Sequence, residues 1–293
     1  MKKMLFILNP IAGMRKANRA LADMLSVFNR SGYTVETYVT ATQGDGRNQV
    51  LQRGKDADVI VCCGGDGTFN EILSGVLEAK LDVPIGYIPS GSTNDFATTL
   101  GLPTDAIQAA HRVVEGTAQS LDVGEFNGRH FSYVASFGAF TKASYSTPQN
   151  VKNALGHTAY LLEGTRELSQ IRKVHVKLIL DGETVEDDFL FGAVCNSTSV
   201  AGILTLSPDR VDLCDGKFEV LLVRAPKDLA EIAECIQAVQ KQTYDCRMLT
   251  FRSAKEVRVY VDSGMDWTLD GERQEGAAEI VIRNLNQAIR VIR

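Results

Sequence analysis

The sequence predicts an α/β domain with a parallel sheet, followed by a mostly antiparallel β domain. Over roughly residues 5–115, short apolar stretches alternate with segments of helical periodicity, which is typical of parallel strands joined by crossover helices. After residue 121, short strand-like stretches are joined by Asn-Gly and Asp-Gly pairs, which is typical of hairpins. We therefore predict domains at 1–121 and 122–293, and roughly the last eight residues could return to the first domain.

The composition indicates a soluble globular protein and excludes several classes. Hydrophobic residues make up 44% of the 293 residues and charged residues 23%, which is ordinary for such a protein. A net charge of −5 with scattered basic residues gives no support for nucleic-acid binding. No apolar run approaches the length of a bilayer span, and the N-terminal run is too short for a signal peptide. The six cysteines contain no Cys-x-x-Cys pair, so we expect reduced packing residues in a cytoplasmic protein.

The expected elements follow from apolar periodicity and turn residues. The expected strands of the first domain are 5–8, 33–39, 59–63 and 83–88, and its helices lie near 17–28, 50–51, 69–79 and 104–115, with Thr104 as the N-cap of the last. The expected strands of the second domain are 121–126, 129–135, 174–180, 185–195, 218–223, 257–261, 280–282 and 289–292, with helices near 151–170 and 227–241.

The most informative stretch is the glycine-rich turn that follows the apolar run Val59–Cys63. It reads Gly-Gly-Asp-Gly-Thr over residues 64–68, and helical spacing follows it. Backbone N–H groups and the positive end of the helix dipole make such a corner an anion site. The turn lacks the lysine of a Walker A loop and the third glycine of a dinucleotide fingerprint.

Asp66 within this turn has two interpretations. An acidic side chain in a phosphate cradle requires a cation between them, which suggests a nucleotide bound with Mg²⁺. Alternatively, Asp66 only turns the chain, because Asp-Gly is a common turn pair.

Two further strands of the predicted parallel sheet end in small, polar, glycine-containing turns, at 9–13 and 90–94. Because ligands of such sheets bind at the carboxyl ends of the strands, three such turns indicate a phosphate-binding crevice. Taken singly, Asn9-Pro10 is an ordinary turn, and Asn94-Asp95 equally suits a helix N-cap.

These blocks together resemble those of the bacterial diacylglycerol kinase-like lipid kinases, which are related to sphingosine and ceramide kinases. The matching segments are Asn9-Pro10-x-x-Gly13, residues 64–71, Gly91–Phe96, Asp122 in Leu-Asp-Val-Gly, Asp215-Gly216 and Asp270-Gly271-Glu272. They occur in order along essentially the whole chain. The resemblance implies an ATP-dependent kinase with a lipid hydroxyl as acceptor and with ATP in a cleft between the two domains.

The resemblance also implies roles for particular residues. Those expected to line or adjoin ATP are Asn9, Pro10, Ile11, Ala12, Gly13, Thr40, Gly64, Gly65, Asp66, Gly67, Thr68, Phe69, Asn70, Glu71 and Ser92. A structural Mg²⁺ site is expected at Asp212, Asp215 and Lys217, although Cys214 stands where relatives often have a second acidic residue. Glu272 is expected to be the catalytic base, with Asp66 beside the nucleotide metal, whereas the sequence alone favours a surface hairpin at 270–272.

Three functions remain as alternatives. The first is phosphorylation of diacylglycerol or a similar lipid alcohol at a membrane surface, by a cytoplasmic protein that could be peripheral at the inner membrane. The second is an NAD kinase, whose proteins share Gly-Gly-Asp-Gly-Thr, but the segment Ser90–Phe96 and the late Asp-Gly-Glu favour a lipid. The third is a catalytically silent nucleotide- or lipid-binding regulator, against which Asp66 and Glu272 both argue. The resemblance leaves a homodimer open.

Overall fold

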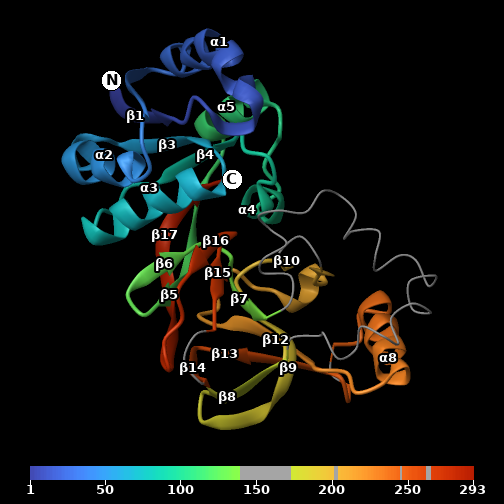
Figure 1. Ribbon diagram of the computed structural model, residues 1–293. Helices are drawn as coiled ribbons and strands as arrows, with labels where there is room; N and C mark the ends of the chain where they lie inside the picture. The colour runs from blue at the N-terminus through green and yellow to red at the C-terminus, as the bar shows by residue number, and fades with distance from the viewer. Residues whose placement is uncertain (139–172, 201–203, 245, 262–264) are drawn as a thin grey trace. The chain divides into compact units, whose positions relative to one another are not determined.

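The computed structural model describes residues 1–138, 173–200, 204–244, 246–261 and 265–293 (Figure 1). The helix expected near 151–170 lies outside these residues. The chain divides into two compact units: the first contains 1–123, 213–215 and 285–293, and the second contains 124–212 and 216–284. Among the described helices, none is both long enough and apolar enough to cross a membrane.

The first unit is a parallel sheet with helices on both faces. Its strands are β1 (Lys2–Leu8), β2 (Tyr33–Val39), β3 (Val59–Gly64) and β4 (Ile85–Pro89), in the order β2-β1-β3-β4. The C-terminal part of β17 (Glu279–Ile292) adds a further parallel strand, in which Val291 pairs with Ile85 of β4. Its helical elements are η1 (Ala12–Arg15), α1 (Lys16–Arg30), α2 (Asp45–Arg53), η2 (Gly54–Asp56), α3 (Asp66–Glu78), α4 (Asp95–Thr99) and α5 (Ala106–Glu115).

The two faces of this sheet are covered by different helices because successive strand residues point to opposite sides. Phe6 of β1 packs with Phe28 of α1 and with Val113 of α5 in one buried cluster. Figure 1 shows α2 and α3 along the other face, where Ile72 and Leu73 of α3 are fully buried. The central strand β3 is buried along its whole length, as a parallel strand covered on both faces should be.

Several helix starts in the first unit differ from the prediction. Helix α3 begins at Asp66 rather than 69, because Gly65 in an extended conformation is its N-cap. The N-cap of α5 is Asp105 rather than Thr104, and its carboxylate accepts hydrogen bonds from the N–H groups of Ile107 and Gln108. Helix α2 begins at Asp45, before the helix expected near 50–51, and the short helix α4 begins at Asp95, where the sequence suggested an N-cap.

The second unit is built from antiparallel strands. Strand β5 (Ala118–Phe126) enters this unit at Gly124, and the N-terminal part of β17 also belongs to it. The other strands are β6 (Arg129–Phe131), β7 (Val134–Gly138), β8 (Val174–Leu180), β9 (Glu183–Cys195), β12 (Phe218–Arg224), β13 (Leu249–Ala254), β14 (Glu256–Val261), β15 (Trp267–Leu269) and β16 (Glu272–Gln274). Their main order is β16-β15-β7-β9-β8-β14-β17, with β12 and β13 joined to β9 and with β6 joined to β5. The unit also contains the short pair β10 (Ser199–Val200) and β11 (Leu204–Thr205), the turn η6 (Pro208–Arg210) and helix α8 (Leu229–Gln240).

Three hairpins of the second unit share one turn type. Each has a two-residue loop in which both residues have positive φ, namely Asn127-Gly128, Asp181-Gly182 and Asp270-Gly271. This is the type I′ turn, whose twist matches that of the flanking strands and which favours Asn or Asp before Gly. The sequence predicted the first two of these turns and, taken without the family resemblance, also favoured a hairpin at 270–272.

Other strands of the second unit differ from the prediction. The stretch 129–135 is not one strand, because the chain breaks at 132–133 between β6 and β7. The stretches 280–282 and 289–292 belong to the single strand β17, and β13, β15 and β16 were not predicted. The buried core of the unit contains Trp267, whose ring packs against Phe126 and Phe137.

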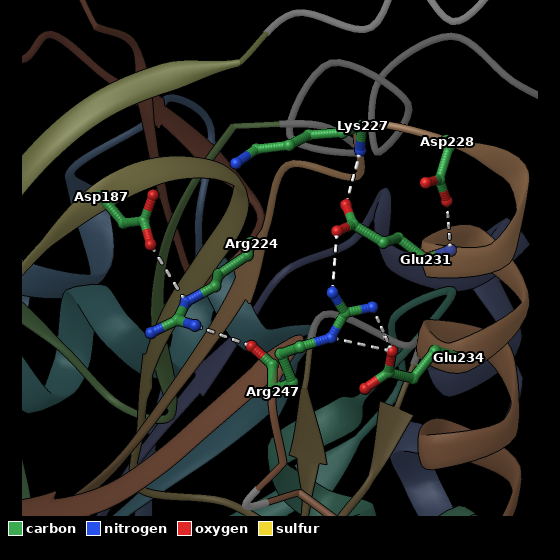
Figure 2. A network of polar contacts seen from close by, with 7 residues as sticks. All are labelled: Asp187, Arg224, Lys227, Asp228, Glu231, Glu234 and Arg247. Carbon is green, nitrogen blue, oxygen red and sulfur yellow. Dashed lines mark hydrogen bonds and ion pairs between the residues drawn. The ribbon is translucent and has the colours of Figure 1, made fainter.

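Helix α8 is held by a network of charged side chains (Figure 2). Arg247 lies just before β13 and pairs with Glu231 and Glu234 of the helix. Arg224, the last residue of β12, donates a hydrogen bond to the carbonyl of Arg247 and pairs with Asp187. Exposed pairs of this kind contribute about 0.2–1 kcal/mol each, so their main effect is to fix the position of the helix.

Candidate active site

The three glycine-containing loops of the first unit lie side by side at the carboxyl ends of β1, β3 and β4. The N–H group of Asn9 donates to the carbonyl of Cys63, and that of Ser90 donates to the carbonyl of Gly64, each at 2.8 Å. The side-chain amide of Asn9 also donates to Oγ1 of Thr68 at 3.0 Å. The structure therefore brings together the residue groups 9–13, 64–68 and 90–94.

Glycine is required at two of these loop contacts. A methyl group on Gly13 would lie 1.9 Å from the carbonyl oxygen of Ser90, and the φ of Gly13 is +48°. A methyl group on Gly91 would lie 2.6 Å from Cα of Gly65. These glycines consequently let the loops approach one another, which adds to the role in phosphate approach that the sequence suggested.

The N-terminus of α3 points into this loop cluster without a side-chain cap. Its N-cap residue is Gly65, and no side-chain hydrogen bond caps the helix. The first backbone N–H groups of a helix have no partner within the helix, and the helix dipole places partial positive charge there. The corner thus has the chemistry of a phosphate site.

Asp66 does more than turn the chain. One carboxylate oxygen accepts from the N–H of Asp95 at 3.0 Å, and the other accepts from the N–H of Phe96 at 3.4 Å. The hydroxyl of Tyr87 also donates to Asp66, at 3.3 Å. Asp66 therefore ties the start of α4 to the start of α3, which its description as a turn residue does not explain.

The side chain of Asn94 does not cap α4, although Asn94 stands at the N-cap position. It has a φ of 54°, and its Oδ1 accepts from the N–H of Gly91 while its amide donates to the carbonyl of Gly91. The sequence offered an N-cap at Asn94-Asp95 as an alternative. Asn94 occupies that position, but the side chain of Asp66 accepts the N–H groups of the helix. Sequence reasoning missed Asp95 and Tyr87 as neighbours of Asp66, because the pairing of β4 with β3 brings them together.

Two of the residues expected at ATP have other contacts. The carboxylate of Glu71 accepts from the N–H of Gly44 at 2.7 Å and from that of Gly46 at 3.0 Å, so it holds the start of α2. Phe69 is fully buried and packs against the rings of Tyr87 and Phe96. Phe69 is therefore a packing residue, and its N–H donates to the carbonyl of Gly65 at 3.0 Å.

Asn70, another residue of the expected ATP set, lies within α3, whereas Ile11, Thr40 and Ser92 lie at loop surfaces or strand ends. Ile11 is 74% exposed, and Ser92 is also exposed. Thr40 follows β2, and its N–H donates to the carbonyl of Leu8 at 2.9 Å. Because β1 and β2 are parallel neighbours, Thr40 lies at the carboxyl end of the strands, as the Asn9 loop does.

The expected catalytic base belongs to the second unit. Glu272 begins β16 directly after the Asp270-Gly271 turn, and its side chain is 43% exposed. Its Oε2 lies 2.8 Å from Nη2 of Arg129, the first residue of β6. A carboxylate at this degree of exposure can accept a proton from a hydroxyl that reaches it.

Asp270 anchors the hairpin that carries Glu272. Its buried carboxylate accepts four hydrogen bonds of 2.5–3.1 Å, from the N–H groups of Ser132, Tyr133 and Val134 and from the hydroxyl of Ser132. Burial raises the pKa of the Asp270 carboxyl, and these hydrogen bonds oppose the rise. The hydrogen bonds also explain why 129–135 is broken at 132–133, which the sequence did not reveal.

Replacement of Asp270 by Asn should lower the free energy of unfolding by about 2–4 kcal/mol, because an amide NH₂ would face buried donors that lose their acceptor. The matched control is Asp181→Asn. Asp181 has the same turn position and a φ of 47°, and it also accepts backbone N–H groups, from Lys255 and Glu256, but it is exposed. Urea unfolding should show a loss several-fold smaller for Asp181→Asn, and equal losses would contradict the role of burial.

The three residues expected at a structural metal are all exposed. Asp215 belongs to the first unit, whereas Asp212 and Lys217 belong to the second. Over the described parts of the chain, no group of three or more His, Cys, Asp or Glu residues is arranged to hold a metal ion. A Mg²⁺ here would therefore depend on backbone oxygens and water, which Mg²⁺ accepts readily.

The polypeptide beside Asp215 is fixed by the first unit. The carbonyl of Cys214 accepts from the side-chain amides of Asn286 and Gln287, at 3.3 and 3.4 Å. The buried carboxylate of Asp122 accepts from Nδ2 of Asn286 at 3.0 Å and from the N–H of Gln287 at 2.7 Å. Asp122 of the Leu-Asp-Val-Gly segment thus has a structural role, because it holds residues 286–287 in place.

Comparison with known proteins defines the class first and then the family. Residues 3–126 match the family model described as the diacylglycerol kinase catalytic domain. Residues 134–293 match the model of the YegS C-terminal NAD kinase beta sandwich-like domain. A catalytic domain of this kind with this partner domain defines a lipid kinase. The chain belongs to the diacylglycerol kinase family.

Relatives and solved structures agree with this assignment. A diacylglycerol kinase of Bacillus subtilis (strain 168) is 32% identical over 274 residues, which cover 93% of this chain and 90% of the relative. A diacylglycerol kinase of Staphylococcus carnosus (strain TM300) is 31% identical, and the alignment covers 99% of this chain and 94% of the relative. The crystal structure of a diacylglycerol kinase from Bacillus anthracis str. Sterne is 22% identical and superposes with a TM-score of 0.77. The superposition covers 99% of this chain and 96% of the solved one, which supports the fold. The predicted fold class, resemblance and enzyme class are confirmed.

Proposed function

We propose that this protein transfers the γ-phosphoryl group of ATP to the free hydroxyl of diacylglycerol, which gives phosphatidic acid and ADP. The acceptor oxygen bonds to the γ-phosphorus, the bond from that phosphorus to the ADP oxygen breaks, and the hydroxyl proton leaves. The observation that carries the proposal is the contact of three glycine loops around the uncapped start of α3, with Asp66 as its first residue.

The nucleotide phosphates would lie against the loops of the first unit. Helix α3 offers backbone N–H groups and a dipole at Gly65, and the loops 9–13 and 90–94 flank it. Ser92 and Thr40 offer hydroxyl groups at the same carboxyl end of the parallel strands. The location of ATP in a cleft between the units, which the family resemblance implies, stays a prediction.

Mg²⁺ would be held near Asp66, where a carboxylate stands among backbone donors suited to phosphate. The donor chemistry fits, because Asp66 and Asp95 begin neighbouring helices and carboxylate oxygens are the ligands that Mg²⁺ prefers. The bound ion would neutralise charge on the phosphate oxygens during transfer. Asp66 would in turn orient the ion toward the phosphates.

A second Mg²⁺ is proposed at Asp215, with backbone oxygens near Asp212 and Lys217. Asp215→Ala should then reduce the rise in melting temperature that added Mg²⁺ produces, because binding to the folded state stabilises it by mass action. Calorimetry with and without Mg²⁺ measures this effect. An unchanged response in the variant would remove Asp215 from the site.

Glu272 would accept the proton of the acceptor hydroxyl. An alcohol is a weak nucleophile, and a carboxylate within hydrogen-bond reach can take its proton as the phosphoryl group arrives. The hairpin anchored by Asp270 gives that carboxylate a fixed backbone.

The substrate lies in a bilayer, so the protein would bind membranes reversibly from the cytoplasmic side. The test incubates the protein with labelled ATP, Mg²⁺ and vesicles that contain diacylglycerol, ceramide, sphingosine or no acceptor, and in a separate arm with NAD. Phosphatidic acid should be the main product, and EDTA should abolish it. Phosphorylation of NAD, or turnover of no acceptor, would contradict the proposal. Flotation of the protein with the same vesicles measures the membrane association.

A further inference from the structure

Arg129 contacts the carboxylate that we assign as the base, and it also contacts a second residue of the same strand. Its Nη2 lies 2.8 Å from Oε2 of Glu272, and its Nη1 donates to Oε1 of Gln274 at 2.9 Å. Side chains two residues apart on a strand point to the same face. One guanidinium therefore spans two neighbouring positions on one face of β16.

The backbone beneath Arg129 is fixed by the β5–β6 hairpin. The tip of this hairpin, Asn127-Gly128, is a type I′ turn. Asn127 also binds β17, because its N–H donates to the carbonyl of Val281 at 3.1 Å and its Oδ1 accepts from the N–H of Val281 at 2.9 Å. Arg129 thus projects from an anchored element.

The backbone beneath Glu272 is fixed as firmly. Asp270, two residues earlier, receives four hydrogen bonds from the segment 132–134, and its own N–H donates to the carbonyl of Val134 at 2.9 Å. Both partners of the Arg129–Glu272 pair consequently come from anchored hairpins of one unit. The fold itself sets their distance.

Stability gives little reason for this pair. The side chains of Arg129 and Glu272 are 41% and 43% exposed, and an exposed ion pair contributes only about 0.2–1 kcal/mol. Its geometric effect is larger. The guanidinium holds Oε2 of Glu272, whereas no hydrogen bond from the described residues reaches Oε1.

We propose that Arg129 is a positioning residue for the phosphoryl transfer, which holds Glu272 so that Oε1 faces the acceptor hydroxyl. This inference rests on the proposed function of Glu272 as the base. Arg129 itself moves no proton, because a guanidinium stays charged. Its contact with Gln274 fixes the plane of the guanidinium and hence the direction of its bond to Glu272.

Arg129→Ala should lower kcat by about 10–100-fold, because a loosely placed reacting group costs up to about 10²-fold in rate. The KM for ATP should stay within about two-fold, since the glycine loops carry nucleotide binding. Arg129→Lys should recover part of kcat, because an ammonium can pair with Glu272 but cannot span both partners.

The decisive measurement is a double-mutant cycle that combines Arg129→Ala with Glu272→Gln. The kcat of each variant is measured by the transfer of labelled phosphate from ATP. If Arg129 acts through Glu272, Arg129→Ala should have almost no further effect when it is combined with Glu272→Gln. The matched control is Arg273→Ala, which breaks the 2.9 Å contact with Asp266 from the neighbouring position of β16. This control should keep kcat, and all variants should keep the melting temperature within about 2 °C, as the loss of one exposed ion pair predicts.

Each outcome decides the inference. Equal losses of kcat from Arg129→Ala in the native protein and in the Glu272→Gln variant would overturn it, as would a normal kcat in Arg129→Ala. A loss in Arg273→Ala as large as that in Arg129→Ala would show a general charge effect and would also overturn it. If Glu272→Gln alone keeps normal kcat, the proposed role of Glu272 as the base fails first. The two failures are thereby distinguished.

Discussion

Glu272→Gln is expected to lose about 10²–10⁴-fold in kcat, which is the usual contribution of a general base. The substitution removes the proton acceptor and changes little else. The new amide side chain keeps nearly the same shape, and its carbonyl oxygen can still accept the hydrogen bond from Arg129 that Glu272 accepts. Steady-state kinetics on diacylglycerol vesicles with varied ATP measures the effect.

Nucleotide affinity separates the possible roles of Glu272. The KM for ATP should change little, because the glycine loops of the first unit carry nucleotide binding. A variant with near-normal kcat would make Glu272 only a hairpin residue, with the base elsewhere. A variant that instead loses ATP affinity would place Glu272 at the metal.

Asp66→Asn should also lose about 10²–10⁴-fold in kcat, since the electrostatic help of a metal ion at a phosphoryl group amounts to several kcal/mol. Asn suits turns as well as Asp does, so a turn role alone predicts a nearly silent change. The variant should also need more Mg²⁺ for half-maximal activity. A Mg²⁺ titration of the rate measures both effects.

The hydrogen bonds that Asp66 accepts require a control, because the loss of a structural contact would lower activity even if Asp66 bound no metal. Tyr87→Phe removes the hydroxyl that donates to Asp66 and keeps the ring that packs on Phe69. It should preserve the Mg²⁺ requirement and lower kcat only slightly. If Tyr87→Phe lost as much kcat as Asp66→Asn, at unchanged Mg²⁺ requirement, Asp66 would act through its hydrogen bonds to the protein and not through a metal.

The sequence predicted the fold class because its signals are local. The buried run Val59–Cys63 and the type I′ pair Asp181-Gly182 each determine an element within a few residues. The predicted N-cap of α5 was wrong by one residue, because Thr104 and Asp105 both suit an N-cap. Only the observed hydrogen bonds of Asp105 distinguish them.

The contacts around the candidate site depend on residues far apart in the chain, which periodicity cannot reveal. The sequence indicated three glycine-containing turns at the carboxyl ends of parallel strands, and the structure shows those loops in contact. It did not indicate that Asp66 supports α4 or that Asp270 binds the segment 132–134, since 138 residues separate Asp270 from Ser132. Because each aspartate precedes a glycine, the sequence alone offered a turn role for both, beside the metal role of Asp66.

The division of β17 between the two units has a consequence for the order of folding during synthesis. Residues 285–293 belong to the first unit, where Val291 pairs with Ile85 of β4, and Arg293 and Thr117 exchange two backbone hydrogen bonds. A nascent chain that ends after residue 123 would therefore leave β4 as an open sheet edge, which is prone to pairing with other chains. Domains usually mature in the order in which the ribosome releases them. Here the unit that begins first has to wait for residues 285–293 to emerge before its sheet is complete.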